Sequence, residues 1–129
     1  CALSLNSENK PLFLKLKTAK EMCQKGVTEF AKSAIKQGST IHTDGYRSYK
    51  KGLLGYEHQP KVYNPNTGLL HWLHVMIRNA KAFIFGTFHG LPKKNLDLYL
   101  SEFCFRFNRR NMHLFERLVV AVGCSFLPD

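Results

Sequence analysis

The chain has 129 residues, of which 44% are hydrophobic and 12% are aromatic. This composition excludes a disordered chain and provides enough apolar material for one core, so we expect a single domain over residues 1–129. The net charge of +10 arises from 19 Lys and Arg against 9 Asp and Glu. Such an excess favours nucleic acid as a partner, because each neutralised phosphate releases counterions. A basic protein without that partner has the same charge, so composition alone leaves both alternatives open.

The four cysteines indicate a reducing compartment. None forms a C-x-x-C pair, and Cys23 and Cys104 lie in otherwise apolar helical patterns, so we expect both thiols to be packed in a core. We therefore expect a cytoplasmic protein. No apolar run approaches the roughly 20 residues of a membrane span, so no membrane is expected as a partner. The chain begins at Cys1 rather than Met, and we expect the gene product to begin further upstream.

The predicted elements follow the order β-β-α-β-α-β-α-α-α. Alternating apolar residues predict strands at residues 2–5, 12–17, 39–43 and 56–63, the first two forming a hairpin. Helical periodicity predicts helices at residues 21–37, 46–54, 69–85, 93–109 and 114–122. Loops are expected at residues 64–68 and 86–92. This order favours an α/β chain of the α+β kind, with a mixed sheet and helices on its faces.

Asp44 is the first candidate for chemistry. It follows the predicted strand 39–43 and precedes Gly45, so its carboxylate is expected to project from the C-terminal end of the strand. Mg²⁺ sites for phosphoryl transfer use such carboxylates together with substrate oxygens. An Asp-Gly pair is also common in turns, so a purely structural role stays open.

One face of the predicted helix 69–85 is polar and mostly cationic. Residues spaced three and four apart stack on one face of an α-helix. Here they are His71, His74, Arg78 and Lys81. Such a face can hold a metal ion or a scissile phosphate beside DNA, or it can simply be solvated. Asn79 lies roughly 140° around the helix from His74 and does not share this face.

Cationic and aromatic side chains alternate at the end of the predicted helix 93–109. Glu102 and Arg106 are spaced for an exposed ion pair, which contributes about 0.3–0.5 kcal/mol. Arg109 and Arg110 are residues of the kind that bind phosphate backbones. A surface ion pair and a DNA contact are both open interpretations of this segment.

Four stretches of the chain form one pattern, defined by their order and by the spacing between them. They are residues 38–49 (GSTIHTDGYRSY), 73–81 (from Leu73-His74 to Asn79-Ala80-Lys81), 86–91 (GTFHGL) and 99–110 (YLSEFCFRFNRR). Together they resemble the ISXO-like group of DDE-superfamily insertion-sequence transposases, and the resemblance covers most of the chain.

The resemblance implies a ribonuclease H-like fold and two-metal phosphoryl transfer. In that fold the first strand carries one catalytic aspartate, two antiparallel strands and a helix follow, and the fourth strand carries the second aspartate. The hairpin would then be strands two and three, and Asp44 the second aspartate. Strand one and its aspartate would be missing, leaving two exposed strand edges. We therefore expect an N-terminally truncated fragment that pairs with another chain or closes the gap differently.

The third catalytic position departs from the pattern of related transposases, which have a glutamate followed seven residues later by a lysine. Lys81 matches that lysine, which places His74 at the glutamate position. Asn79 is an alternative because it follows Asp44 by 35 residues, and Glu102 is a third. Helical geometry favours His74, although a neutral imidazole is a softer ligand than a carboxylate.

The resemblance thus implies metal-dependent DNA strand cleavage and transfer at insertion-sequence ends, with Mg²⁺ or Mn²⁺ as the cofactor. The implied catalytic residues are Asp44, His74, Lys81 and Asn79, and the first two would hold the metal. DNA contacts are expected from Arg78, Lys81, His89, Arg106, Asn108, Arg109 and Arg110. The expected partners are DNA, at the element ends and the target, and further copies of the chain in a homo-oligomer on the bacterial nucleoid. The alternative is an inactive remnant that binds DNA without cutting it, and we expect the fragment alone to be inactive.

Overall fold

The structure is a computed structural model that describes residues 1–20, 23–61, 70–88 and 90–126. The elements of these ranges follow the predicted order. The strands are β1 (Ala2–Leu5), β2 (Pro11–Lys15), β3 (Thr40–Thr43) and β4 (Glu57–Pro60). The helices are α1 (Gln24–Ala34), α2 (Arg47–Gly52), α3 (His71–Thr87), the short 3₁₀ helix η2 (Lys93–Asn95), α4 (Leu96–Asn108) and α5 (Leu114–Phe126). The predicted loop at 64–68 lies outside the described residues.

Helix α1 is shorter at both ends than the predicted helix 21–37. It begins after Cys23, whose Sγ accepts a hydrogen bond from the Gly26 N–H at 3.4 Å. It ends before Ile35, whose backbone is extended. Cys23 is exposed, so the prediction that it is packed in a core is wrong, whereas Cys104 is buried as predicted. Apolar neighbours in the sequence did not reveal that Cys23 stands outside the helix as its N-terminal cap.

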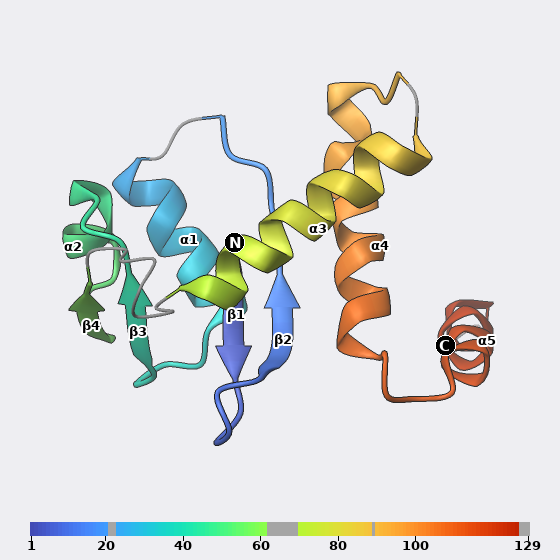
Figure 1. Cartoon of the computed structure of the whole chain (residues 1–129), viewed down its shortest axis with the longest axis horizontal. Coiled ribbons are helices and arrows are strands. Elements are labelled where there is room, and N and C mark those ends of the chain that lie inside the picture. The colour runs from blue at the N-terminus through green and yellow to red at the C-terminus, as the bar shows by residue number, and fades with distance from the viewer. Residues whose placement is uncertain (21–22, 62–69, 89, 127–129) are drawn as a thin grey trace.

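The strands form two sheets of two strands each. β1 runs antiparallel to β2, with Leu3 opposite Leu14. β3 runs parallel to β4, with Ile41 opposite His58. Figure 1 shows the strands in the order β4, β3, β1, β2, with the pair β4 and β3 set apart from the pair β1 and β2. The predicted mixed α/β class is confirmed, but the described strands do not form one continuous sheet, because β1 and β3 share no hydrogen-bonded ladder.

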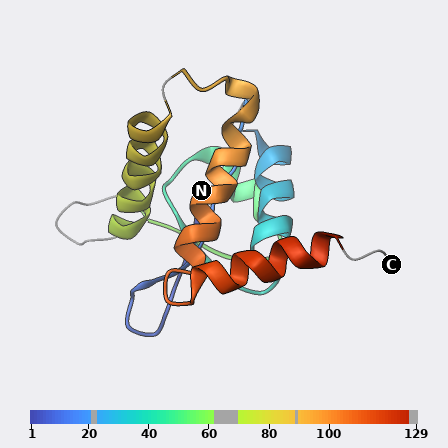
Figure 2. The same cartoon turned by 90° about the vertical axis from the view of Figure 1, so that its right-hand side faces the viewer.

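Helices lie on both sides of the strands. α3 crosses in front of β1 in Figure 1, and α1 lies behind, so Figure 2 shows these two helices on opposite sides. α4 runs along the outer side of β2. β2 is therefore covered on the edge that does not pair with β1.

The core lies where β2, α3 and α4 meet. Leu14, Met76 and Cys104 are buried there, and Leu14 is only 2% exposed. The half-buried side chains packed around them are Leu3, Leu16, Val75, Phe103 and Phe107. This core fixes α3 and α4 against the hairpin, and so it positions the polar faces of both helices.

Helix α5 lies to one side of the other elements (Figure 1). Its apolar side chains include Phe115, which is 78% exposed, and Val120, which is 58% exposed. Across the described ranges, no helix has both the length and the apolar character needed to cross a membrane.

Candidate catalytic and DNA-binding site

Asp44 stands where the chain leaves β3 and turns into α2. The last ladder bond runs from the Lys61 N–H to the Thr43 carbonyl at 2.8 Å. Asp44 itself is exposed, and its Oδ1 accepts a hydrogen bond from the Tyr46 N–H at 3.3 Å. The carboxylate thus caps the turn before α2 while remaining open to solvent. The predicted location at the C-terminal end of a strand is found in the structure.

Two tyrosines accompany this carboxylate. Tyr49 is half-buried, and its ring meets that of Tyr46 edge-on at 6.1 Å between centroids. Burial first, and then the negative charge of Asp44, raise the pKa of the Tyr49 hydroxyl above its ordinary value. Tyr49 therefore stays a neutral hydrogen-bonding group beside Asp44 at physiological pH.

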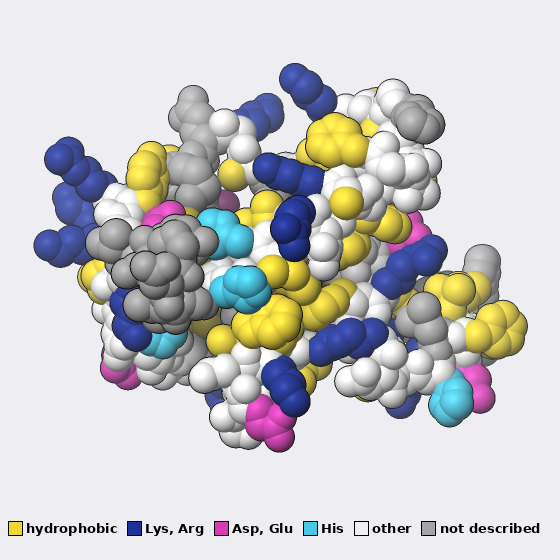
Figure 3. Space-filling model, in the orientation of Figure 1, with side chains coloured by type: hydrophobic (Ala, Val, Ile, Leu, Met, Phe, Trp, Pro, Cys, Tyr) yellow, Lys and Arg dark blue, Asp and Glu magenta, His cyan; other side chains and the backbone are white. Residues whose placement is uncertain are grey.

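The cationic face predicted for α3 is exposed along its length. His71, His74, Arg78 and Lys81 are all exposed, as is Asn79. On the opposite side, Met76 and Ala80 are buried. Figure 3 shows histidine and Lys or Arg side chains following the course of α3 across one surface of the molecule. The helix therefore turns its apolar face to the core and its polar face to solvent.

The described residues do not gather a complete set of metal ligands. Within residues 1–20, 23–61, 70–88 and 90–126, no three or more His, Cys, Asp or Glu side chains are grouped so that they could hold a metal ion. This part of the chain accordingly does not bring Asp44, His74 and a further such ligand together. His89 lies outside the described residues.

Glu102 and Arg106 form the predicted ion pair on α4. The Arg106 guanidinium donates to Glu102 Oε1 from Nε at 3.0 Å and from Nη2 at 2.7 Å. Their side chains are 39% and 60% exposed, so solvent screens the pair and its contribution to stability is small. The pairing also offsets the charge that Arg106 could offer to a phosphate.

Arg109 and Arg110 follow with their guanidinium groups over aromatic rings. Cζ of Arg109 lies 3.9 Å from the centroid of the Phe105 ring, and Cζ of Arg110 lies 4.1 Å from that of Phe107. Stacking of this kind holds a guanidinium flat and leaves its edge available for hydrogen bonds. In the described structure, neither arginine forms an ion pair with a carboxylate.

The end of α4 also binds the backbone of β2. Asn108 accepts the Leu14 N–H at 2.7 Å and donates to the Leu14 carbonyl at 2.9 Å. Arg110 donates to the carbonyls of Pro11 and Leu12. These side chains replace a strand partner along β2. The DNA contacts predicted for Asn108 and Arg110 stay predictions, and both residues have this second role.

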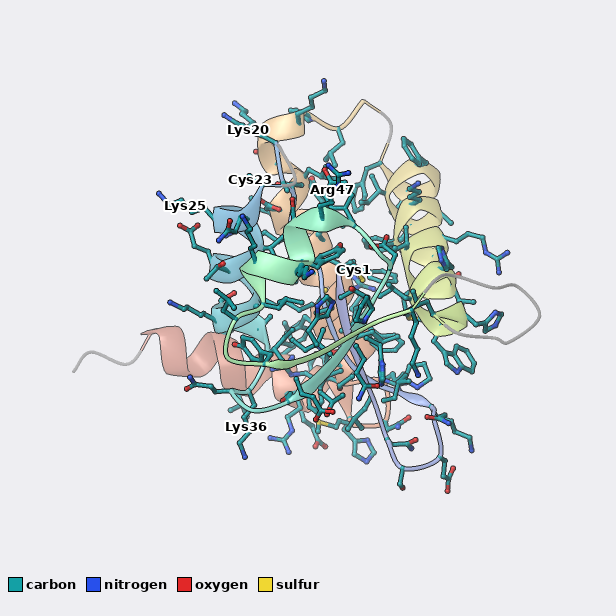
Figure 4. All side chains as sticks on the ribbon, turned by 90° about the vertical axis from the view of Figure 1, so that its left-hand side faces the viewer. Cys1, Lys20, Cys23, Lys25, Lys36 and Arg47 are labelled. Carbon is teal, nitrogen blue, oxygen red and sulfur yellow. The ribbon has the colours of Figure 1, made fainter. Side chains whose placement is uncertain are left out.

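Basic side chains are not confined to α3 and α4. Figure 4 shows Lys20, Lys25 and Lys36 extending outward near α1, and Arg47 at the start of α2. Because the cations surround the molecule, net charge alone does not select one DNA-binding surface.

The structure adds His58 and Thr43 to the residues around Asp44. His58 Nε2 lies 2.7 Å from Thr43 Oγ1, and this hydroxyl donates to the Asp44 carbonyl at 2.7 Å. Sequence reasoning missed both residues. The strand at 56–63 was predicted, but only its register with β3 shows that His58 reaches Thr43.

The chain matches the ISXO2-like transposase domain over residues 1–108. The chain therefore belongs to the family of ISXO2-like transposase domains, a class of proteins that act in DNA transposition. Among curated proteins and among solved structures, no match to the chain is found. Helix α5 lies outside the matched range.

Proposed function

We propose that this domain cleaves and joins DNA strands at the ends of an insertion sequence, with Asp44 as one of its catalytic carboxylates. The observation that carries the proposal is an exposed carboxylate at the C-terminal end of β3, in a chain of a transposase family. Water would attack a phosphodiester at the element end and break its bond to the 3′-oxygen, which leaves as a free 3′-hydroxyl. That hydroxyl would attack a phosphodiester of the target and displace a 3′-oxygen of the target, the attacking oxygen losing its proton and the leaving oxygen taking one up in each step. Loss of metal-dependent strand cleavage in Asp44→Ala tests the proposal, and undiminished cleavage would sink it.

Mg²⁺ or Mn²⁺ is the cofactor proposed with this activity, but the described residues do not complete its site. Hard cations favour carboxylate oxygens and keep water or substrate oxygens in the remaining positions. Asp44 supplies one carboxylate. In the described part of the chain, no three His, Cys, Asp or Glu side chains are grouped so that they could hold a metal ion.

For the third catalytic position we retain His74, with Asn79 as the alternative. Both residues are exposed on α3, and Lys81 lies on the helical face of His74. Glu102 is less suitable, because its carboxylate oxygen accepts both hydrogen bonds from Arg106. Strand cleavage by His74→Ala and by Asn79→Ala tests the choice, since loss of the catalytic residue should slow the chemical step far more than loss of the other residue.

The proposed DNA surface combines the exposed face of α3 with the end of α4. Arg78 and Lys81 would contact phosphates near the cleaved bond, and Arg109 would hold the backbone with a guanidinium that no carboxylate neutralises in the described structure. Arg106 offers less charge because of Glu102. Contacts from His89, Asn108 and Arg110 remain part of the proposal.

One observation favours a second function, DNA binding without cleavage. The described ranges hold no three-ligand metal group, while the chain carries a net charge of +10. A remnant with these properties would bind duplex DNA with an affinity that falls steeply as salt rises. Salt-sensitive binding with no metal-dependent nicking would establish this second function in place of the first.

A further inference from the structure

Three groups form a continuous hydrogen-bonded chain at the end of β3. His58 on β4 contacts the Thr43 hydroxyl at 2.7 Å, and Thr43 contacts the carbonyl of Asp44 at 2.7 Å. His58 and Thr43 are both half-buried, whereas Asp44 is exposed. This series of hydrogen bonds therefore connects the half-buried imidazole of His58 to the backbone of Asp44, the exposed residue to which the proposed function gives a catalytic role.

Proton counting fixes the direction of these hydrogen bonds. A threonine hydroxyl has a single proton to donate, and here the Asp44 carbonyl accepts it. The contact with His58 must then be made by an N–H of the imidazole that donates to the hydroxyl oxygen. Nε2 is the atom in contact, so we infer that His58 donates from Nε2.

These hydrogen bonds hold the backbone of Asp44 just after the end of β3. The ladder between β3 and β4 ends with the bond from the Lys61 N–H to the Thr43 carbonyl. Asp44 follows directly after β3, and the Thr43 hydroxyl donates a hydrogen bond to its carbonyl. On the other side, the Asp44 carboxylate accepts the Tyr46 N–H at 3.3 Å. Together these bonds restrict the backbone torsions that aim the carboxylate.

We propose that His58 is a positioning residue for Asp44, acting through the Thr43 hydroxyl on the Asp44 carbonyl. The proposal rests on the proposed catalytic role of Asp44. A group held in one orientation before the substrate arrives needs no reorganisation during the reaction. Loss of the imidazole N–H would leave Asp44 in place but less uniformly oriented.

The tautomer of His58 provides a test that is independent of activity. Nitrogen-15 correlation spectra of the imidazole, recorded at about pH 8 where ordinary histidines are neutral, should show the proton on Nε2. Thr43→Val removes the hydroxyl at nearly constant shape and should change the His58 signals. A proton on Nδ1, or signals that Thr43→Val leaves unchanged, would overturn the proposal.

Strand cleavage by the protein expressed from its complete reading frame provides the second test. His58→Phe and Thr43→Val should each slow cleavage by about two- to tenfold, the effect of one neutral hydrogen bond. His58→Gln keeps an N–H donor, Thr43→Ser keeps the hydroxyl, and both should retain most of the rate. The double variant His58→Phe with Thr43→Val should be no slower than the slower single variant, because both remove one chain of bonds.

The outcomes separate this inference from the proposed function. If Asp44→Ala cleaves normally, the catalytic role of Asp44 fails, and the inference fails with it. If Asp44→Ala is inactive while His58→Phe and Thr43→Val cleave normally, only the inference fails. A rate loss in His58→Phe that parallels a loss of thermal stability, with no recovery in His58→Gln, would assign His58 to strand pairing and overturn the positioning role.

Discussion

Asn108 joins two segments that are 94 residues apart in the sequence, because its amide satisfies both the N–H and the carbonyl of Leu14. Asn108→Ala leaves these two part-buried backbone groups without partners. We expect a loss of about 1–3 kcal/mol in the free energy of unfolding, measured by urea denaturation. Asn111→Ala removes an exposed amide nearby and should change stability by less than about 0.5 kcal/mol. Equal losses in the two variants would contradict the bridging role.

Asp97 makes a second connection between α4 and the segment after β2. Its carboxylate accepts the Thr18 N–H at 2.7 Å and the Thr18 hydroxyl at 2.8 Å. The backbone hydrogen bond first, and then that of the hydroxyl, lower the pKa of Asp97 below its ordinary value. The unfolded chain therefore takes up this proton at a higher pH than the folded chain does.

The stabilisation from Asp97 should accordingly be present at neutral pH and be lost as the pH falls through its lowered pKa. We expect the difference in thermal midpoint between the wild type and Asp97→Asn to be largest near neutrality and to close in acid. The effect is small because the carboxylate is exposed. Glu29→Gln, which alters a carboxylate without a hydrogen bond or ion pair in the described structure, should show no such convergence. A difference in thermal midpoint between the wild type and Asp97→Asn that widens in acid would contradict a stabilising role of the ionised Asp97 carboxylate.

At the scale of elements, Gly52 lies where α2 packs closely against α1. A Cβ at this position would lie 2.7 Å from Val27 Cγ1 and 2.9 Å from Val27 Cβ. Gly52→Ala should therefore lower the free energy of unfolding by about 1–3 kcal/mol, and adding Val27→Ala should recover part of the loss. Gly86 in α3 has open space around it, so Gly86→Ala should be neutral or stabilising by up to about 1 kcal/mol. Denaturant titrations measure both, and a neutral Gly52→Ala would contradict this packing.

The order and type of the elements could be predicted from the sequence because periodicity is a local property of the chain. The hairpin, the strand before Asp44 and the polar face of α3 are all found where the pattern indicated. Contacts between distant segments could not be predicted in the same way. The bonds from His58 to Thr43 and from Asn108 to Leu14 depend on strand register and on how α4 docks. Periodicity specifies neither.

The separation of the strands into two sheets could not be predicted either, because it also depends on contacts between distant segments. Alternating residues predict each strand, but a ladder requires two backbones at hydrogen-bonding distance. Among the described strands, β1 and β3 share no such ladder. The ribonuclease H-like topology therefore remains a prediction.

At the scale of the whole molecule, the described structure leaves strand edges and apolar side chains exposed. The unpaired edges of β1 and β3 are candidates for pairing with a further strand, and α5 exposes Phe115, Leu118 and Val119. We predict that the 129-residue chain self-associates at micromolar concentration, as measured by light scattering. Leu118→Lys should weaken association through α5 but leave pairing of strand edges intact. A monodisperse monomer would contradict the prediction.

The central claim is that Asp44 takes part in DNA strand cleavage. The most direct measurement compares the wild type, Asp44→Asn and Glu29→Gln, each expressed from the complete reading frame. The substrate is a duplex that carries the genomic sequences flanking that frame, and the assay is run with and without Mg²⁺. We expect Asp44→Asn to lose at least about 100-fold in cleavage rate while still binding the duplex, and Glu29→Gln to cleave like the wild type. Undiminished, Mg²⁺-dependent cleavage by Asp44→Asn would contradict the claim.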